Sequence, residues 1–218
     1  MPKDVDNFWD RLREADADLN RAAELLPQDP TPWAWMLWTA KGLQFDHDEE
    51  QRRFNEAIKR SPGHRAAHSF YLDAIKPKWG GSREQVEAFA ADTLKRARPG
   101  SHMLVVIPEA IVELAEYDAP HGQSKPDPAS YYARPDIVAQ LRSANDLLFR
   151  SDRFKMNMDT PRTRAWFAYA LWKAGLLDEA AEHLRIIGPS TPWGPFPAPV
   201  FFLSKDTIKK ARKQCGVR

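Results

Sequence analysis

Apolar residues recur at intervals of three and four along most of the chain, which is the period of amphipathic helices. The first such stretch covers residues 4–26, where leucines and alanines alternate with charged positions. Further helices are predicted over residues 32–43, 46–59, 64–75, 83–97, 103–117, 136–149, 165–174 and 177–187. Turn and capping signals separate them, including Ser61-Pro62-Gly63 and a Ser82 that precedes Gln85 by three residues. The pattern predicts an all-α protein.

The predicted helices fall into pairs. Pro30, Pro62 and Pro99 stand at comparable places and delimit two units of similar length, each with two helices. A third unit is irregular, and a fourth spans residues 165–187, with Gly175 at the turn between its helices. We expect one domain over residues 1–218. Its irregular parts are an insertion at 118–135, an extended proline-rich segment at 189–203 and a basic C-terminal helix at 204–215.

The fourth unit resembles a single tetratricopeptide repeat. If Gly175 is the turn glycine of that repeat, its signature positions hold Phe167, Ala168, Leu171, Ala180, Leu184, Ile187 and Pro192. The spacing of the three prolines is also near the 34-residue period of the repeat. The resemblance implies a right-handed α-α superhelix of about four helix pairs with an N-terminal helix, a scaffold that binds another molecule.

A second resemblance covers residues 30–115. This stretch, with Lys76-Pro77-Lys78-Trp79-Gly80-Gly81-Ser82 as its connector, is similar to a group of bacterial tetratricopeptide-like domains that share a PKWGGS-type connector and have no assigned biochemical role. It implies the same fold and a bacterial source, and it implies no activity. From the residues themselves, the two glycines allow a turn, Ser82 caps the next helix and Trp79 fills a gap between helix pairs.

Composition narrows the function classes. The formal net charge is +2, so bulk charge favours neither nucleic acid nor a membrane surface. Cys215 is the single cysteine, the N-terminus is too polar for a signal peptide, and no apolar run is long enough to span a bilayer. We expect a cytoplasmic protein. His64 and His68 have no third ligand near them in sequence, and the connector lacks P-loop spacing, so no metal and no cofactor are predicted.

The groove of the implied superhelix is the main candidate site. The resemblance implies that the first helix of each pair lines it, which places aromatic and basic residues there and no acid. Aromatic rings supply contact area, and Arg or Lys can hold a carboxylate. The hypothesis is a non-enzymatic scaffold for a protein or peptide, with an acidic segment or a free C-terminus as its ligand; the alternative is that the rings pack between helix layers. The candidates are Trp35, Trp38, Lys41, Arg65, His68, Arg162, Trp166, Tyr169, Trp172 and Lys173.

Two alternative functions remain open. The 118–135 loop carries His121, Asp127, Tyr131 and Tyr132, and convergence of His121 with Asp118 or Asp127 would suit a small enzyme or a small-ligand binder. The tail from residue 205 onward carries six basic residues against one acid, which would suit contact with nucleic acid. Nothing in the sequence requires catalysis.

Overall fold

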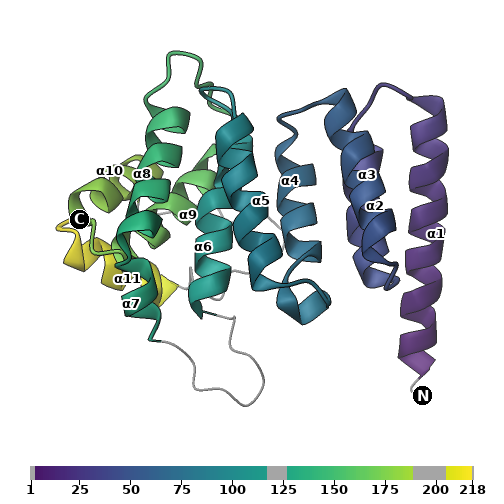
Figure 1. The fold of residues 1–218 in the computed structure, drawn as a ribbon, viewed down its shortest axis with the longest axis horizontal. Helices are drawn as coiled ribbons and strands as arrows, with labels where there is room; N and C mark the ends of the chain where they lie inside the picture. The colour runs from purple at the N-terminus through teal and green to yellow at the C-terminus, as the bar shows by residue number, and fades with distance from the viewer. Residues whose placement is uncertain (1–2, 117–126, 189–204, 218) are drawn as a thin grey trace. The chain divides into compact units, whose positions relative to one another are not determined.

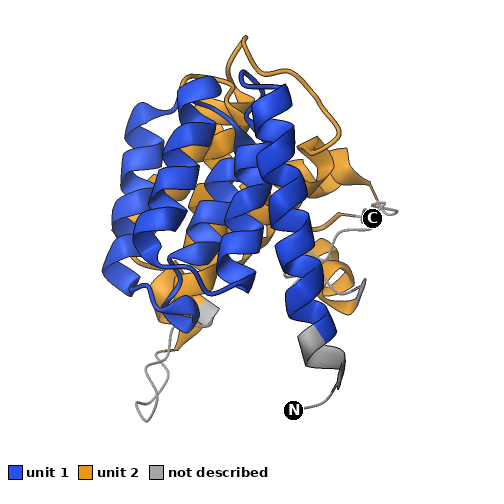
Figure 2. Ribbon diagram, turned by 90° about the vertical axis from the view of Figure 1, so that its right-hand side faces the viewer, with its two compact units in different colours: residues 1–97 blue, residues 98–218 orange. Residues whose placement is uncertain are grey.

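The computed structural model describes residues 3–116, 127–188 and 205–217, and every regular element within them is a helix (Figure 1). The prediction of an all-α protein is therefore confirmed. Two compact units divide the chain, residues 1–97 and residues 98–218 (Figure 2). Helix α7, Pro128–Tyr132, lies inside the segment that the sequence analysis expects to be irregular. Its five residues are too few to show a helical period.

The first unit contains α1 (Lys3–Leu25), α2 (Thr31–Gly42), α3 (His47–Arg60), α4 (Arg65–Ala74), the short 3-10 helix η1 (Pro77–Trp79) and α5 (Arg83–Arg96). Helix α2 is central and packs against α1, α3 and α4. Its small buried residue Ala34 permits close approach, and Leu37 and Phe54 fill the space beside it. Phe54 stacks on Tyr71 at 4.4 Å between ring centroids, which joins α3 to α4.

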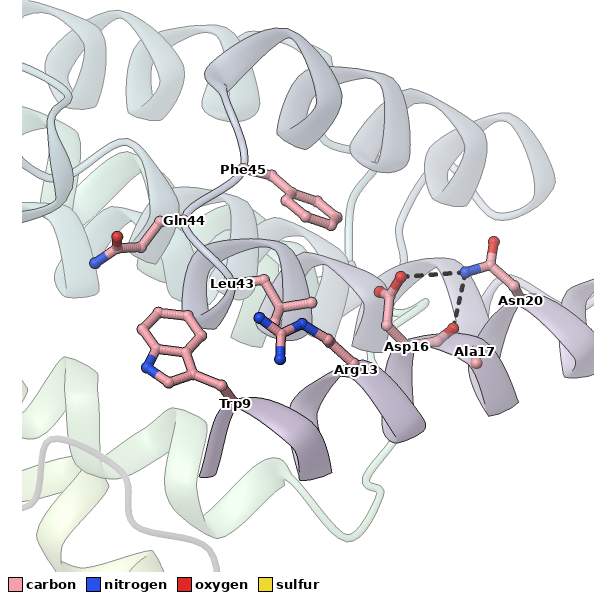
Figure 3. A pocket seen from close by; sticks show the side chains of 8 residues that line it. All are labelled: Trp9, Arg13, Asp16, Ala17, Asn20, Leu43, Gln44 and Phe45. Carbon is pink, nitrogen blue, oxygen red and sulfur yellow. Dashed lines mark hydrogen bonds between the residues drawn. The ribbon is translucent and has the colours of Figure 1, made fainter. Parts of the chain in front are cut away.

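A connector of four residues, 43–46, joins α2 to α3. Leu43, Gln44 and Phe45 border an open pocket whose other side is α1 (Figure 3). Asp46 then caps α3 by accepting a hydrogen bond from the Glu49 amide at 2.9 Å. Its spacing to Glu49 is the capping signal that predicts this helix start.

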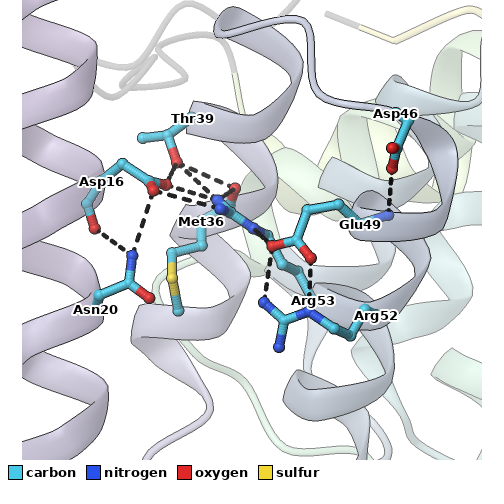
Figure 4. A network of polar contacts seen from close by, with 8 residues as sticks. All are labelled: Asp16, Asn20, Met36, Thr39, Asp46, Glu49, Arg52 and Arg53. Carbon is cyan, nitrogen blue, oxygen red and sulfur yellow. Dashed lines mark hydrogen bonds and ion pairs between the residues drawn. The ribbon is translucent and has the colours of Figure 1, made fainter.

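One buried arginine connects three helices of this unit (Figure 4). Arg53 of α3 is only 3% exposed, and its guanidinium donates to Asp16 of α1 at 2.6 Å and to Glu49 of its own helix at 2.6 Å. It also donates to the Met36 carbonyl of α2 at 2.7 Å and to the Thr39 hydroxyl at 3.2 Å. Because a buried cation needs both counter-charge and hydrogen bonds, these contacts fix α1, α2 and α3 against one another.

The second unit contains the 3-10 helix η2 (His102–Val105), α6 (Val106–Glu116), α7, α8 (Pro135–Phe149), α9 (Thr160–Lys173), α10 (Leu177–Ile187) and α11 (Lys205–Gln214). Helix α9 is central; it packs against α10, α6, α8 and α7 and is buried over most of its length. Gly175 ends the α9–α10 turn with a φ of +74°, and the next amide, of Leu176, returns to the Leu171 carbonyl at 2.9 Å. This is the left-handed helix end that the sequence predicts.

A buried polar chain crosses the second unit. His183 of α10 donates from Nε2 to the side-chain oxygen Oδ1 of Asn145 at 2.8 Å and accepts at Nδ1 from the Arg164 guanidinium at 3.2 Å. Burial, and then the neighbouring Arg164 charge, lower the pKa of His183 to about 3. The imidazole is therefore neutral over the whole physiological range of pH.

We predict that the Arg53→Met variant loosens the α1 end of the first unit. The substitution leaves Asp16 partly buried without its cation, and breaking such a pair costs about 3–5 kcal/mol. Hydrogen exchange should show protection of α1 amides falling by more than 100-fold while α8–α10 amides keep theirs. In a double-mutant cycle with Asp16→Asn, the two effects should fall well short of additive, because each removes the same interaction. Full additivity would contradict the pairing.

We also predict an acid-sensitive contribution from His183. Below pH 6.5 the unfolded chain binds a proton that the folded chain does not take up until about pH 3. Stability is lost as the pH falls through that window, by about 1.4 kcal/mol per pH unit for this group. Chemical denaturation at pH 6.5 and pH 5 should show the difference between wild type and His183→Gln shrinking by about 1.6 kcal/mol, because the unfolded histidine is already half protonated at pH 6.5. A difference that does not change with pH would mean that folded His183 titrates normally.

Candidate functional site

Helices α2 and α4 of the first unit share an aromatic face. Trp35 and Trp38 lie one helical turn apart on α2, and both contact Phe70 of α4, with ring centroids 5.1 and 5.5 Å apart. Trp38 is 41% exposed although it belongs to a helix that is otherwise largely buried. The face therefore presents an indole to solvent from a rigid backbone.

The connector after α4 brings a second indole to the same place. Gly80 directly follows η1 with a φ of +94° that suits glycine, and the Gly81 amide returns to the Lys76 carbonyl at 3.2 Å. This turn holds Trp79, which is 49% exposed. The sequence analysis expects Trp79 to fill a gap between helix pairs. About half of its surface is exposed to solvent instead, so the residue is not buried between them.

A lysine lies against both exposed rings. Lys41 Nζ is 4.6 Å from the Trp38 ring centroid and 5.0 Å from that of Trp79, within the range of cation–π attraction. Lys41 also forms an ion pair with Asp73 of α4, and Lys76 pairs with the same carboxylate at 3.1 Å. We call these five residues, Trp38, Lys41, Asp73, Lys76 and Trp79, the tryptophan–lysine cluster.

A histidine at the start of α3, His47, contacts the connector that carries Trp79. His47 Nδ1 lies 2.7 Å from a carboxylate oxygen of the buried Glu50. Hydrogen bonding to Glu50, and then to the Gly80 backbone, raises the pKa of His47, while burial raises the pKa of Glu50. The imidazole thus ties α3 to the turn that carries Trp79.

The groove residues that sequence reasoning assigns to the first two units have different surroundings. Trp35, Trp38 and Lys41 lie together on the aromatic face. His68 is buried beside Phe54, its Nδ1 is 3.0 Å from the His64 carbonyl, and burial lowers its pKa. Arg65 is half-buried at the first position of α4.

In the fourth predicted unit most of the candidate rings are covered. Trp166 is 3% exposed and Tyr169 is also buried. The Trp172 indole donates to the Gln214 side chain of α11 at 2.7 Å and packs on a cluster that includes Ala211. Lys173 Nζ lies over the Tyr169 and Tyr132 rings at 5.8 and 5.6 Å. Arg162, the fifth candidate, is half-buried near the start of α9.

The loop candidates are only partly described. His121 and Asp118 lie outside the described residues. Asp127 caps α7 by accepting from the Ala129 amide at 3.2 Å, and Tyr131 and Tyr132 are buried. The basic C-terminal helix α11 is anchored by Arg212, which donates to the Leu184 carbonyl at 2.8 Å, while Lys209, Lys210 and Lys213 are exposed.

Sequence reasoning missed Phe70, Asp73 and Lys76 as parts of the site and gave Trp79 a packing role. Their side chains reach α2 only because α4 and η1 fold back beside it. The one available signal was the density of aromatic and basic residues in 70–79, where Phe70, Lys76, Lys78 and Trp79 follow one another closely.

Comparison of the chain with protein-family models, with curated proteins and with solved structures finds no match. No helix in the part of the chain that the structure describes is long and apolar enough to cross a membrane. The site must therefore be interpreted from its own chemistry.

We predict that Gly81→Ala displaces the connector. A Cβ at this position would lie 1.9 Å from the Ile75 carbonyl oxygen, so the backbone must shift. We expect a loss of about 3 kcal/mol in stability together with a changed environment of Trp79. Gly175→Ala serves as the comparison, because its Cβ meets nothing within 4 Å and only the φ of +74° is unfavourable, which costs about 1 kcal/mol. Thermal denaturation and tryptophan fluorescence measure both, and equal losses would contradict the steric argument.

Proposed function

We propose that the protein is a non-enzymatic scaffold that binds a peptide segment of a partner protein on the tryptophan–lysine cluster. The observation that carries this proposal is a pair of tryptophans, Trp38 of α2 and Trp79 of η1, that are each at least two-fifths exposed and whose rings both lie within 5.0 Å of the Lys41 ammonium.

The exposed rings supply the binding energy. Tryptophan is among the residues most enriched at energetic hot spots, because a large, stiff ring buries much area at a small entropic cost. Trp38 is held by Phe70, and Trp79 by the turn at Gly80 and Gly81. A partner segment therefore meets rings that are already in position, so little ordering remains to oppose binding.

The charges of the cluster favour an acidic ligand. Two ammonium groups, of Lys41 and Lys76, lie around the single carboxylate of Asp73. We therefore propose a segment that places an Asp or Glu side chain, or a free C-terminal carboxylate, beside apolar residues.

The proposed architecture is a tetratricopeptide-like superhelix. Two pairs of consecutive helices pack closely, α2 with α3 in the first unit and α9 with α10 in the second. The Gly175 turn joins the helices of the second pair. In such an arrangement first helices of neighbouring pairs lie side by side. The packing of α2 against α4, which forms the aromatic face, is the contact that supports this architecture.

A display library of random peptides, selected on the full chain, tests the proposal. We expect enrichment of peptides that combine an aromatic or aliphatic residue with a carboxylate. For a synthetic peptide of this kind, Trp38→Ala and Trp79→Ala should each weaken binding by roughly 30-fold, about 2 kcal/mol, as measured by calorimetry. Amidation or neutralisation of the carboxylate should weaken it in the wild type.

Phe8→Ala is the matched control, since Phe8 is an exposed aromatic residue of the same unit outside the cluster, at 56% exposure. It should leave affinity unchanged. Circular dichroism of each variant checks that the helices persist. Selection of no peptide, or binding that survives both tryptophan substitutions in folded protein, would reject this function.

A further inference from the structure

The pocket between α1 and the α2–α3 connector shares no residue with the tryptophan–lysine cluster (Figure 3). It is an open depression with a volume of about 770 Å³, which is large enough to hold a small molecule. One wall comes from α1, where Trp9, Arg13, Asp16 and Asn20 recur on a single face. The facing wall comes from the connector, through Gln44 and Phe45 among others.

Two aromatic rings give the pocket its apolar character. Trp9 is half-buried on α1, and Phe45 projects from the connector with 39% of its surface exposed. The Arg53 guanidinium lies 4.9 Å from the Phe45 ring centroid, so the ring packs against a buried cation. Rings on opposite walls, one of them fixed by a buried cation, suit a ligand with a planar apolar body.

The acid in the pocket is already neutralised. The Asp16 carboxylate accepts from Arg53 at 2.6 and 3.3 Å, from the Asn20 amide at 3.3 Å and from the Thr39 hydroxyl. Four donors saturate the lone pairs of a carboxylate. Asp16 therefore exerts little attraction on a cationic ligand, although it is the one acid among the lining residues.

Arg13 sets the sign of the ligand charge. It follows Trp9 by one helical turn, so both side chains lie on the pocket face of α1 (Figure 3). Its ion pair with Asp10, at 2.9 Å, is exposed on both sides, and such pairs contribute little to stability. The guanidinium can exchange this partner for a ligand carboxylate, which it can hold through two parallel hydrogen bonds.

Gln44 contributes a further polar group from an unusual backbone conformation. It is the one non-glycine residue with positive φ, at +58°, in the described part of the chain. A glycine would adopt this conformation without steric strain, whereas glutamine adopts it at a steric cost. Its amide offers both a donor and an acceptor to a ligand.

We propose that this pocket binds a small molecule with a planar apolar body and a carboxylate group. The body lies between Trp9 and Phe45, the carboxylate pairs with Arg13, and Gln44 binds a polar edge. This site is separate from the proposed peptide site, so either can exist without the other.

Naphthalene-2-carboxylate and its neutral amide, naphthalene-2-carboxamide, are suitable probes for calorimetry with the full chain. We expect one saturable site for the carboxylate and at least 10-fold weaker binding of the amide. Arg13→Gln should weaken carboxylate binding about 10-fold and leave the amide unchanged. Phe45→Ala should weaken both probes, and Gln44→Gly should weaken binding while the protein stays at least as stable as wild type.

Arg11→Gln is the matched control. Arg11 is an exposed arginine of α1 that pairs with Glu14 three residues later, as Arg13 pairs with Asp10, but it does not line the pocket. This variant should bind the carboxylate like wild type. The proposal is overturned if neither probe saturates a site, if both probes bind equally well, or if Arg11→Gln and Arg13→Gln have the same effect. Loss of peptide binding in the Trp38 and Trp79 variants has no bearing on these results.

Discussion

The first unit depends on a positive charge that has been taken out of water. Removing the Arg53 guanidinium from solvent is costly, and the cost is offset only while Asp16, Glu49, Thr39 and the Met36 carbonyl all remain in place. Each partner lies on a defined turn of α1, α2 or α3, so the set of bonds fixes how these helices are shifted along one another. A lysine could not do the same, because its ammonium lacks the planar fork that reaches several acceptors at once.

Both candidate sites are consequences of this arrangement. Helix α2 ends at Gly42, directly before the connector, so fixing α2 also fixes Trp38 and Lys41 on the helix and Phe45 on the connector that follows it. The tryptophan–lysine cluster then requires α4 and η1 beside α2, while the pocket requires α1. In each case a rigid helix carries the charged group, and a short connector supplies an exposed aromatic ring.

Much of the fold was predictable because helices leave local signals. The three-and-four period, the caps at Asp46 and Ser82, and the glycine turn at Gly175 all concern residues close in sequence. The Arg53–Asp16 pair was not predictable, because its members stand far apart in a chain with many charges. For the site, the repeat resemblance assigned Trp35, Trp38 and Lys41 to one surface, and their spacing of three residues agrees with one side of a helix. Aromatic richness could not distinguish exposed Trp38 from buried Trp166, since both occupy helices with apolar residues on several sides.

Gly81 lies so close to the Ile75 carbonyl that the shape of the connector is set by backbone against backbone. In evolutionary terms, this separates two kinds of change within one short segment. Substitutions at Lys78 or Trp79 alter what the surface can recognise, and selection can explore them while the turn persists. A side chain at position 81 alters the turn itself, so descendants of this chain are free to acquire new ligands at this surface only while they keep that glycine.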